Sequence, residues 1–126
     1  LFLGIIMAVP FVDSLTTNLD HSLPLTVGEF DEFGNAKDKK DHFDYIYSYA
    51  PYNNIKKMDY PHMLITTSLS DNRVLFDEPA KFTAKLREYK AHRVASSDGV
   101  NQSYGLRVGH TGKSYTSISD SVGIHS

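Results

Sequence analysis

The chain has 126 residues, which is enough for one domain at most. Its 13 basic and 15 acidic residues give a formal net charge of −2, so the composition offers no electrostatic reason to bind nucleic acid. The chain has no cysteine, which excludes disulfides and thiolate chemistry and favours a cytoplasmic protein.

The first predicted element is a strand in the apolar run that opens the chain. Residues Gly4 to Val9 are apolar and are followed by Pro10. The run is shorter than the roughly 20 residues of a membrane span. It also lacks the basic segment and the small-residue cleavage site of a signal peptide. We therefore expect a buried strand whose upstream sequence lies outside this chain, and no contact with a membrane.

A short helix and a long irregular segment follow this strand. Asp13 is placed to cap a helix over Ser14 to Leu19. Residues 20–40 show no regular period and contain Pro24 and Gly34. A segment of this length without regular structure is usually functional or disordered. Its apolar and aromatic content argues against disorder, so we expect an ordered loop.

The next prediction is a second helix, which follows a charged stretch. Residues Lys37 to Asp41 read as a solvated surface. A helical stripe then ends before Pro51 and consists of Phe43, Ile46, Tyr47 and Ala50. Four tyrosines lie close together here, and we interpret them as packing on a sheet rather than as a platform for bases. They are Tyr45, Tyr47, Tyr49 and Tyr52.

A strand, a polar loop and a helix occupy residues 60–90. The run Met63 to Thr67 is apolar or β-branched, as in a strand buried on both faces of a parallel sheet. After the polar break, Asp77 can cap a helix that buries one face, formed by Phe82, Leu86 and Tyr89. Ligands and catalytic groups of such sheets lie at the carboxyl ends of strands. The polar loop at that end contains Asp71 and Arg73.

A histidine downstream of this loop suggests acid–base chemistry. His110 lies between two glycines directly after a short apolar run, Leu106 to Val108. Asp71 followed by His110 matches the second half of the order Ser…Asp…His in α/β-hydrolases. An Asp in a strand–helix loop is also common turn chemistry, so both interpretations stay open at this point.

Two other patterns carry no function. The sequence Gly112-Lys113-Ser114 has the ending of a phosphate-binding loop, but Arg107 occupies the position where that motif needs a glycine. The 6 histidines are scattered and show no metal-ligand spacing. The sequence therefore predicts neither a metal site nor a cofactor.

Several long segments of the chain resemble the catalytic domain of the prolyl oligopeptidase family of serine peptidases, and most closely its oligopeptidase B branch. The resemblance covers residues 1 to about 90 and a short island around His110. The matching segments are VPFVDSLTTNLDHSLPLTVGEFDEFGN (9–35), YIYSYAPYNNI (45–55), YPHMLITTSLSDNRV (60–74), EPAKFTAKLRE (78–88) and GHTGKS (109–114).

The resemblance implies roles for five residues. Asp71 and His110 correspond to the acid and the base of a catalytic triad. Glu29 and Asp31 correspond to paired acidic residues that hold the Arg or Lys side chain of the substrate, although the family has Glu at the second position. Arg73 corresponds to a residue that can hold a substrate backbone carbonyl. The alternatives are solvated carboxylates in the loop and a surface ion pair from Arg73 to a neighbouring Asp.

The chain departs from the family in four respects. It contains no G-x-S-x-G nucleophile elbow, which in the family lies upstream. Ser70 stands where the family normally has His, and residues 91–103 and 115–126 differ in character from the family.

We therefore expect a single partial domain over residues 1–126. It would be the C-terminal portion of an α/β-hydrolase domain, with a mostly parallel sheet and flanking helices. Its partners would be short peptides with Arg or Lys and the remainder of the parent peptidase, which would supply the serine. The alternative is a catalytically inactive fragment that binds peptide or packs on a partner. The upstream sequence would separate the two interpretations.

Overall fold

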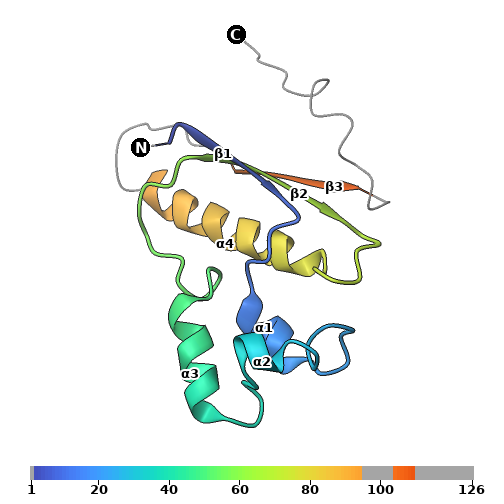
Figure 1. The fold of residues 1–126 in the computed structure, drawn as a ribbon. Helices are drawn as coiled ribbons and strands as arrows, with labels where there is room; N and C mark the ends of the chain where they lie inside the picture. The colour runs from blue at the N-terminus through green and yellow to red at the C-terminus, as the bar shows by residue number, and fades with distance from the viewer. Residues whose placement is uncertain (1, 95–103, 110–126) are drawn as a thin grey trace.

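The computed structural model describes residues 2–94 and 104–109. Strands and helices alternate in the pattern of an α/β fold, as the sequence predicts (Figure 1). The elements are β1 (Gly4–Ala8), α1 (Ser14–Leu19), α2 (Phe30–Phe33), α3 (Lys40–Tyr49), β2 (His62–Ser68), α4 (Asp77–Val94) and β3 (Tyr104–Gly109).

The strands form a parallel sheet in the order β1-β2-β3. Helices α1 to α3 lie in the connection from β1 to β2, and α4 lies in the connection from β2 to β3. The register pairs Ala8 with Thr66 and Ser68 with Gly109. Because the strands are parallel, their carboxyl ends lie at one edge of the sheet, where loops that carry functional groups gather.

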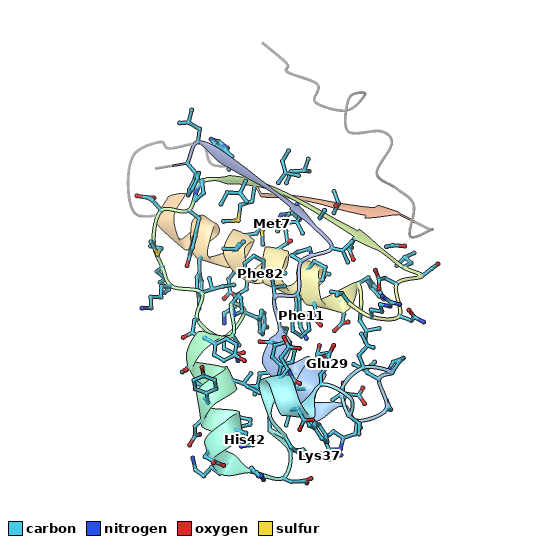
Figure 2. All side chains as sticks on the ribbon, viewed as in Figure 1. Met7, Phe11, Glu29, Lys37, His42 and Phe82 are labelled. Carbon is cyan, nitrogen blue, oxygen red and sulfur yellow. The ribbon has the colours of Figure 1, made fainter. Side chains whose placement is uncertain are left out.

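The main core lies between the sheet and α4, which crosses one face of the sheet in Figure 1. In Figure 2, Met7 of β1 lies in the layer between the two. The predicted apolar face of α4 is confirmed, since Phe82 and Leu86 are buried and Tyr89 packs against them. Buried members of this core are Val12, Ile55, Met63, Ile65, Phe82 and Leu86.

The other face of the sheet is more open than the sequence predicts. Met63, Ile65 and Thr67 of β2 are buried, but the alternating residues Leu64 and Thr66 are only half-buried. The prediction that the run 63–67 is buried on both faces is therefore wrong for this chain. The expected burial of the first strand is wrong as well, because the residues of β1 alternate between exposed and half-buried. An unbroken apolar run fits a doubly covered strand, but among the described elements α4 covers only one face.

Helices α1 and α3 pack together around a smaller core. Asp13 caps α1 as predicted, because its carboxylate accepts a hydrogen bond from Thr16 N at 3.3 Å. The predicted stripe of α3 is confirmed except at Tyr47, which is exposed. Tyr45 and Tyr49 are exposed as well, so their expected packing on the sheet is wrong. The buried members are Leu15, Ala36, Ile46 and Ala50.

The segment 20–40 is mainly turns with one short helix, α2, which the sequence did not reveal. Glu29 N donates to Leu25 O at 3.1 Å before this helix, and Gly34 N donates to Phe30 O at 2.9 Å at its end. Gly34 then adopts φ 89° and ψ 170°, a region open almost solely to glycine. Asn35 N donates to His42 Nδ1 of α3 at 2.9 Å, so α3 fixes the exit of the segment.

Candidate active site and substrate pocket

The loop after β2 holds Asp71 in a defined turn. Asp71 N donates to Ser68 O at 3.3 Å, which turns the chain off the end of the strand. The Oδ1 atom of Asp71 then accepts from Arg73 N at 2.9 Å and from Val74 N at 3.0 Å. This is the turn chemistry that a short acidic side chain favours. It orients the carboxylate and uses one of its two oxygens.

The register of the sheet places β3 beside this loop. Gly109, the last residue of β3, pairs with Ser68, the last residue of β2. The predicted base, His110, follows Gly109 in the sequence but lies outside the described residues. The Asp71 loop and the end of β3 are thus neighbours at the carboxyl edge of the sheet.

A cavity of about 150 Å³ lies between this loop and the segment that carries Glu29. That volume is comparable to a cavity that holds one benzene ring, so it can take a side chain but not a folded partner. Glu29 and Arg73 both line it and bring opposite charges to its wall. The remaining lining residues are Phe11, Thr17, Leu23, Pro24, Leu25, Thr26, Phe33, Asn72 and Val74.

The structure separates the two acidic residues that the sequence analysis paired. Glu29 is half-buried at the cap of α2 and lines the cavity. Asp31 is exposed in the first turn of α2 and does not line the cavity.

Arg73 is exposed and, among the described residues, makes no ion pair with Asp71 or Asp77. Asp77 is the first residue of α4 rather than its cap, and it pairs with Lys81 at 3.4 Å.

Two buried carboxylates join α4 to the start of α1. Glu78 Oε2 accepts from Val12 N at 3.2 Å and from Asp13 N at 2.9 Å, while its Oε1 accepts from the Thr17 hydroxyl. Asp13 is fully buried and pairs with Lys81 Nζ at 2.5 Å.

Burial and the contacts of this network shift the pKa values of Glu78 and Lys81. Burial raises the pKa of Glu78 above its ordinary 4.5, although hydrogen bonds from Thr17 and from the Asp13 backbone oppose the shift. Burial by itself would lower the pKa of Lys81. The hydrogen bond and charge of Asp13 outweigh that effect, so the pKa of Lys81 lies above its usual value. Lys81 therefore pairs with one buried carboxylate, Asp13, and with one exposed carboxylate, Asp77.

The sequence analysis did not find the apolar wall of the cavity or the role of Glu78. Phe11, Thr17 and Phe33 are ordinary residues with no motif of their own, and the tertiary fold brings them to one cavity. An acidic residue before Pro79 at a helix start normally indicates a favourable helix dipole. Nothing in that local pattern shows that the carboxylate is buried.

The fold and site together define a portion of an α/β-hydrolase fold. A parallel sheet has helical crossovers, and an oriented carboxylate follows the end of a strand. The sequence model of the prolyl oligopeptidase family matches residues 1–117, so the chain belongs to this family of peptidases.

Individual relatives agree with this assignment. Protease 2 of Moraxella lacunata is 46% identical over 114 residues, which cover 90% of this chain and 16% of that protein. Dipeptidyl aminopeptidase BI of Pseudoxanthomonas mexicana is 42% identical over 87% of this chain and 14% of its own length.

Solved structures agree as well. Oligopeptidase B from Leishmania major superposes with a TM-score of 0.72 at 38% identity. Oligopeptidase B from Trypanosoma brucei with covalently bound antipain has the same TM-score at 41% identity. Each match covers 86% of this chain and 14% of the solved chain. The chain thus spans about one-seventh of the length of these relatives.

Proposed function

We propose that this chain supplies the acid and the base of a Ser-Asp-His triad in a peptidase that cleaves short peptides after Arg or Lys. The serine would come from residues outside this chain, because the 126 residues contain no G-x-S-x-G sequence. The observation that carries the proposal is the pairing of Ser68 with Gly109. It brings the Asp71 loop beside the strand that leads into His110.

The chemistry follows the usual division of labour in a triad. His110 would take the proton of the serine as it attacks the carbonyl, and would return it to the leaving amine. Asp71 would accept a hydrogen bond from the imidazole Nδ1–H, fix its tautomer and stabilise the imidazolium. The two backbone N–H contacts of Asp71 use Oδ1, and Oδ2 would serve the imidazole.

The cavity supports recognition of a basic side chain. Glu29 would hold a guanidinium or ammonium by a charge-assisted hydrogen bond. Arg73, which also lines the cavity, would donate to a backbone carbonyl of the substrate. Asp31 lies outside the lining and would act at longer range through its charge.

The proposal also includes the rest of the parent protein and the compartment in which it acts. The chain would act together with the remainder of its parent peptidase, since the matched residues make up only 16% and 14% of its relatives. We place the protein in the cytoplasm, because a chain without cysteine does not depend on an oxidising compartment. No helix among the described residues is long and apolar enough to cross a membrane.

The experiment compares turnover of arginyl peptides by the full-length protein and its Asp71→Asn variant. Asn keeps the Oδ1 acceptor for the two loop N–H groups but removes the charge, so the loop should stay folded. We expect kcat to fall by about 10⁴, as happens when a triad acid is replaced and the wrong imidazole tautomer results. His110→Ala should lower kcat at least as far, and the double variant should be no worse than the single ones.

The control is Asp41→Asn, which neutralises an exposed carboxylate in the first turn of α3. It should leave kcat unchanged. The substrate panel contains N-blocked and free-amine arginyl peptides, together with matched peptides that have a neutral residue at the cleavage site. Normal turnover by Asp71→Asn would contradict the triad assignment. A wild-type protein that neither hydrolyses the panel nor labels with a serine-directed phosphonate would favour an inactive peptide-binding fragment.

A further inference from the structure

Glu78 connects two parts of the chain that lie 61 to 66 residues apart. It belongs to the first turn of α4, and its side chain is buried against the start of α1. Its two oxygens accept from two backbone N–H groups and one hydroxyl, which are the donors of Val12, Asp13 and Thr17. Each of these donors comes from the segment between β1 and the middle of α1.

A second contact runs in the opposite direction between the same elements. Asp13 Oδ1 caps α1 at Thr16 N, and Asp13 Oδ2 pairs with Lys81, which lies one turn after Glu78 in α4. The segment that enters α1 is thus fixed to α4 at two adjacent points. A carboxylate with several hydrogen-bond donors in a dry site has a well-defined position, because any shift leaves a buried donor without an acceptor.

These contacts lie directly behind the substrate cavity. One wall of the cavity includes Phe11 and Thr17, and another includes Arg73 and Val74. Glu78 binds the hydroxyl of Thr17 and the backbone N–H next to Phe11. It also follows Val74 by four residues in the chain, at the helix that begins where the Arg73 loop ends. Glu78 therefore joins the Phe11–Thr17 wall to α4, the helix that begins where the loop of Arg73 and Val74 ends.

We infer that Glu78 is a positioning residue for substrate binding, which holds the Phe11–Thr17 wall of the cavity against the Arg73 wall. This inference rests on the proposed function. Glu78 would not touch the substrate or the reacting atoms. Its loss would widen or shift the cavity, and the cost would appear in binding of the side chain rather than in the chemical step.

The test measures KM and kcat for arginyl peptides with the full-length protein, with the concentration of active sites determined by titration. Thr17→Val removes the donor on the cavity side and keeps the shape of the side chain. Glu78→Leu removes all three contacts at similar volume. Because hydrogen bonds to charged groups contribute most in dry sites, we expect KM to rise about tenfold in Thr17→Val and at least as much in Glu78→Leu. The kcat per active site should stay within about twofold in both variants, as for lost uniform binding.

Two further variants test whether the change in KM depends on the contacts of Glu78. Glu78→Gln keeps one oxygen for the Val12 and Asp13 N–H groups and can donate its amide to Thr17, so it should restore KM to within about threefold of wild type. Glu88→Leu changes an exposed residue of the same helix and should leave KM unchanged. A merely structural role would lower the fraction of active sites and leave KM as it is.

The outcomes separate this inference from the proposed function. Turnover of arginyl peptides that is lost in Asp71→Asn supports the proposed function. If KM in that active protein is unchanged by Thr17→Val, the positioning role of Glu78 is wrong and the proposed function stands, even where Glu78→Leu does not fold. A wild-type protein that turns over no arginyl peptide overturns both.

Discussion

At the scale of single residues, two buried carboxylates connect the start of α1 to α4. Asp13 and Glu78 are both almost inaccessible to solvent, yet each meets a different partner. Asp13 pairs with the ammonium of Lys81, whereas Glu78 is held by backbone and hydroxyl donors. A carboxylate that is buried without a cation of its own has an unfavourable charged form, and this explains the raised pKa of Glu78.

The raised pKa predicts how stability depends on pH. Because the folded chain binds the Glu78 proton more tightly than the unfolded chain, the free energy of unfolding falls as pH rises from about 4.5 through the higher folded pKa. Glu78→Gln removes this titration. We expect the stability of wild type, measured relative to Glu78→Gln, to decrease through that pH range in urea unfolding of the chain.

The control for this measurement is Glu88→Gln, an exposed residue of α4. Its stability relative to wild type should be nearly constant over the same range, because Glu88 is exposed and the variant keeps the buried Glu78 carboxylate. Curves for wild type and Glu78→Gln that run parallel from pH 4 to pH 8 would contradict the account of Glu78.

The sequence predicted some positions at this scale and missed others. Asp71 and Arg73 are in the loop at the carboxyl end of β2 where a strand–loop–helix pattern places them. Glu29 lines the cavity, but Asp31 two residues later does not. The difference arises because α2 turns the chain between them, and a four-residue helix leaves no periodic signal in the sequence.

Helices and strands with a strong local signal were predicted well. The cap of α1 at Asp13, the buried stripe of α3 and the buried face of α4 were each predicted from residue types and spacing. Segment 20–40 could not be derived in this way, because its conformation depends on contacts with other elements. The hydrogen bond from Asn35 N to His42 Nδ1 is one such contact, and it joins the exit of α2 to α3.

The exit of α2 gives a prediction at the scale of the element. Gly34 has φ 89°, and a Cβ at this position would lie 2.5 Å from Nδ1 of His42. Gly34→Ala therefore forces a strained backbone and displaces the ring that accepts the Asn35 hydrogen bond. We expect a loss of about 1–3 kcal/mol of stability, typical of a non-glycine residue in such a region. Urea unfolding of the chain measures this loss.

Gly28 provides a matched control in the same segment. A Cβ at Gly28 would meet only Leu25 O at 3.5 Å, an ordinary contact. Gly28→Ala should change stability by less than about 0.5 kcal/mol, as for most surface substitutions. If Gly34→Ala is as well tolerated as Gly28→Ala, then neither the backbone conformation nor the His42 contact holds the end of α2.

At the scale of the whole molecule, the sheet is predicted correctly in direction but not in coverage. Alternation of strands and helices is enough to predict parallel pairing, because a helical crossover returns the chain in the same direction. Burial of both faces was inferred from the apolar run 63–67. Which elements cover each face depends on long-range packing, and in the described structure α4 covers only one face.

β1 lies at an edge of the sheet, and this edge affects the behaviour of the isolated chain. β1 pairs only with β2 among the described strands, so its second edge presents backbone N–H and C=O groups without strand partners. Apolar side chains stand beside that edge, with Leu3 94% exposed and Ile6 62% exposed. An edge that combines open hydrogen-bonding groups with apolar side chains is a template for association.

We therefore expect the 126-residue chain to self-associate in solution through β1. Ile6→Lys places a charge in the middle of this strand and should shift the chain toward monomer, since a charged residue blocks edge pairing. Sedimentation velocity over a concentration series measures the shift. The control is Met58→Lys, which changes an apolar residue of similar exposure, 54%, in the loop before β2. It adds the same charge away from the sheet. If Met58→Lys dissociates the chain as well as Ile6→Lys does, net charge rather than the β1 edge controls association, and a wild-type chain that is monomeric throughout would contradict the prediction altogether.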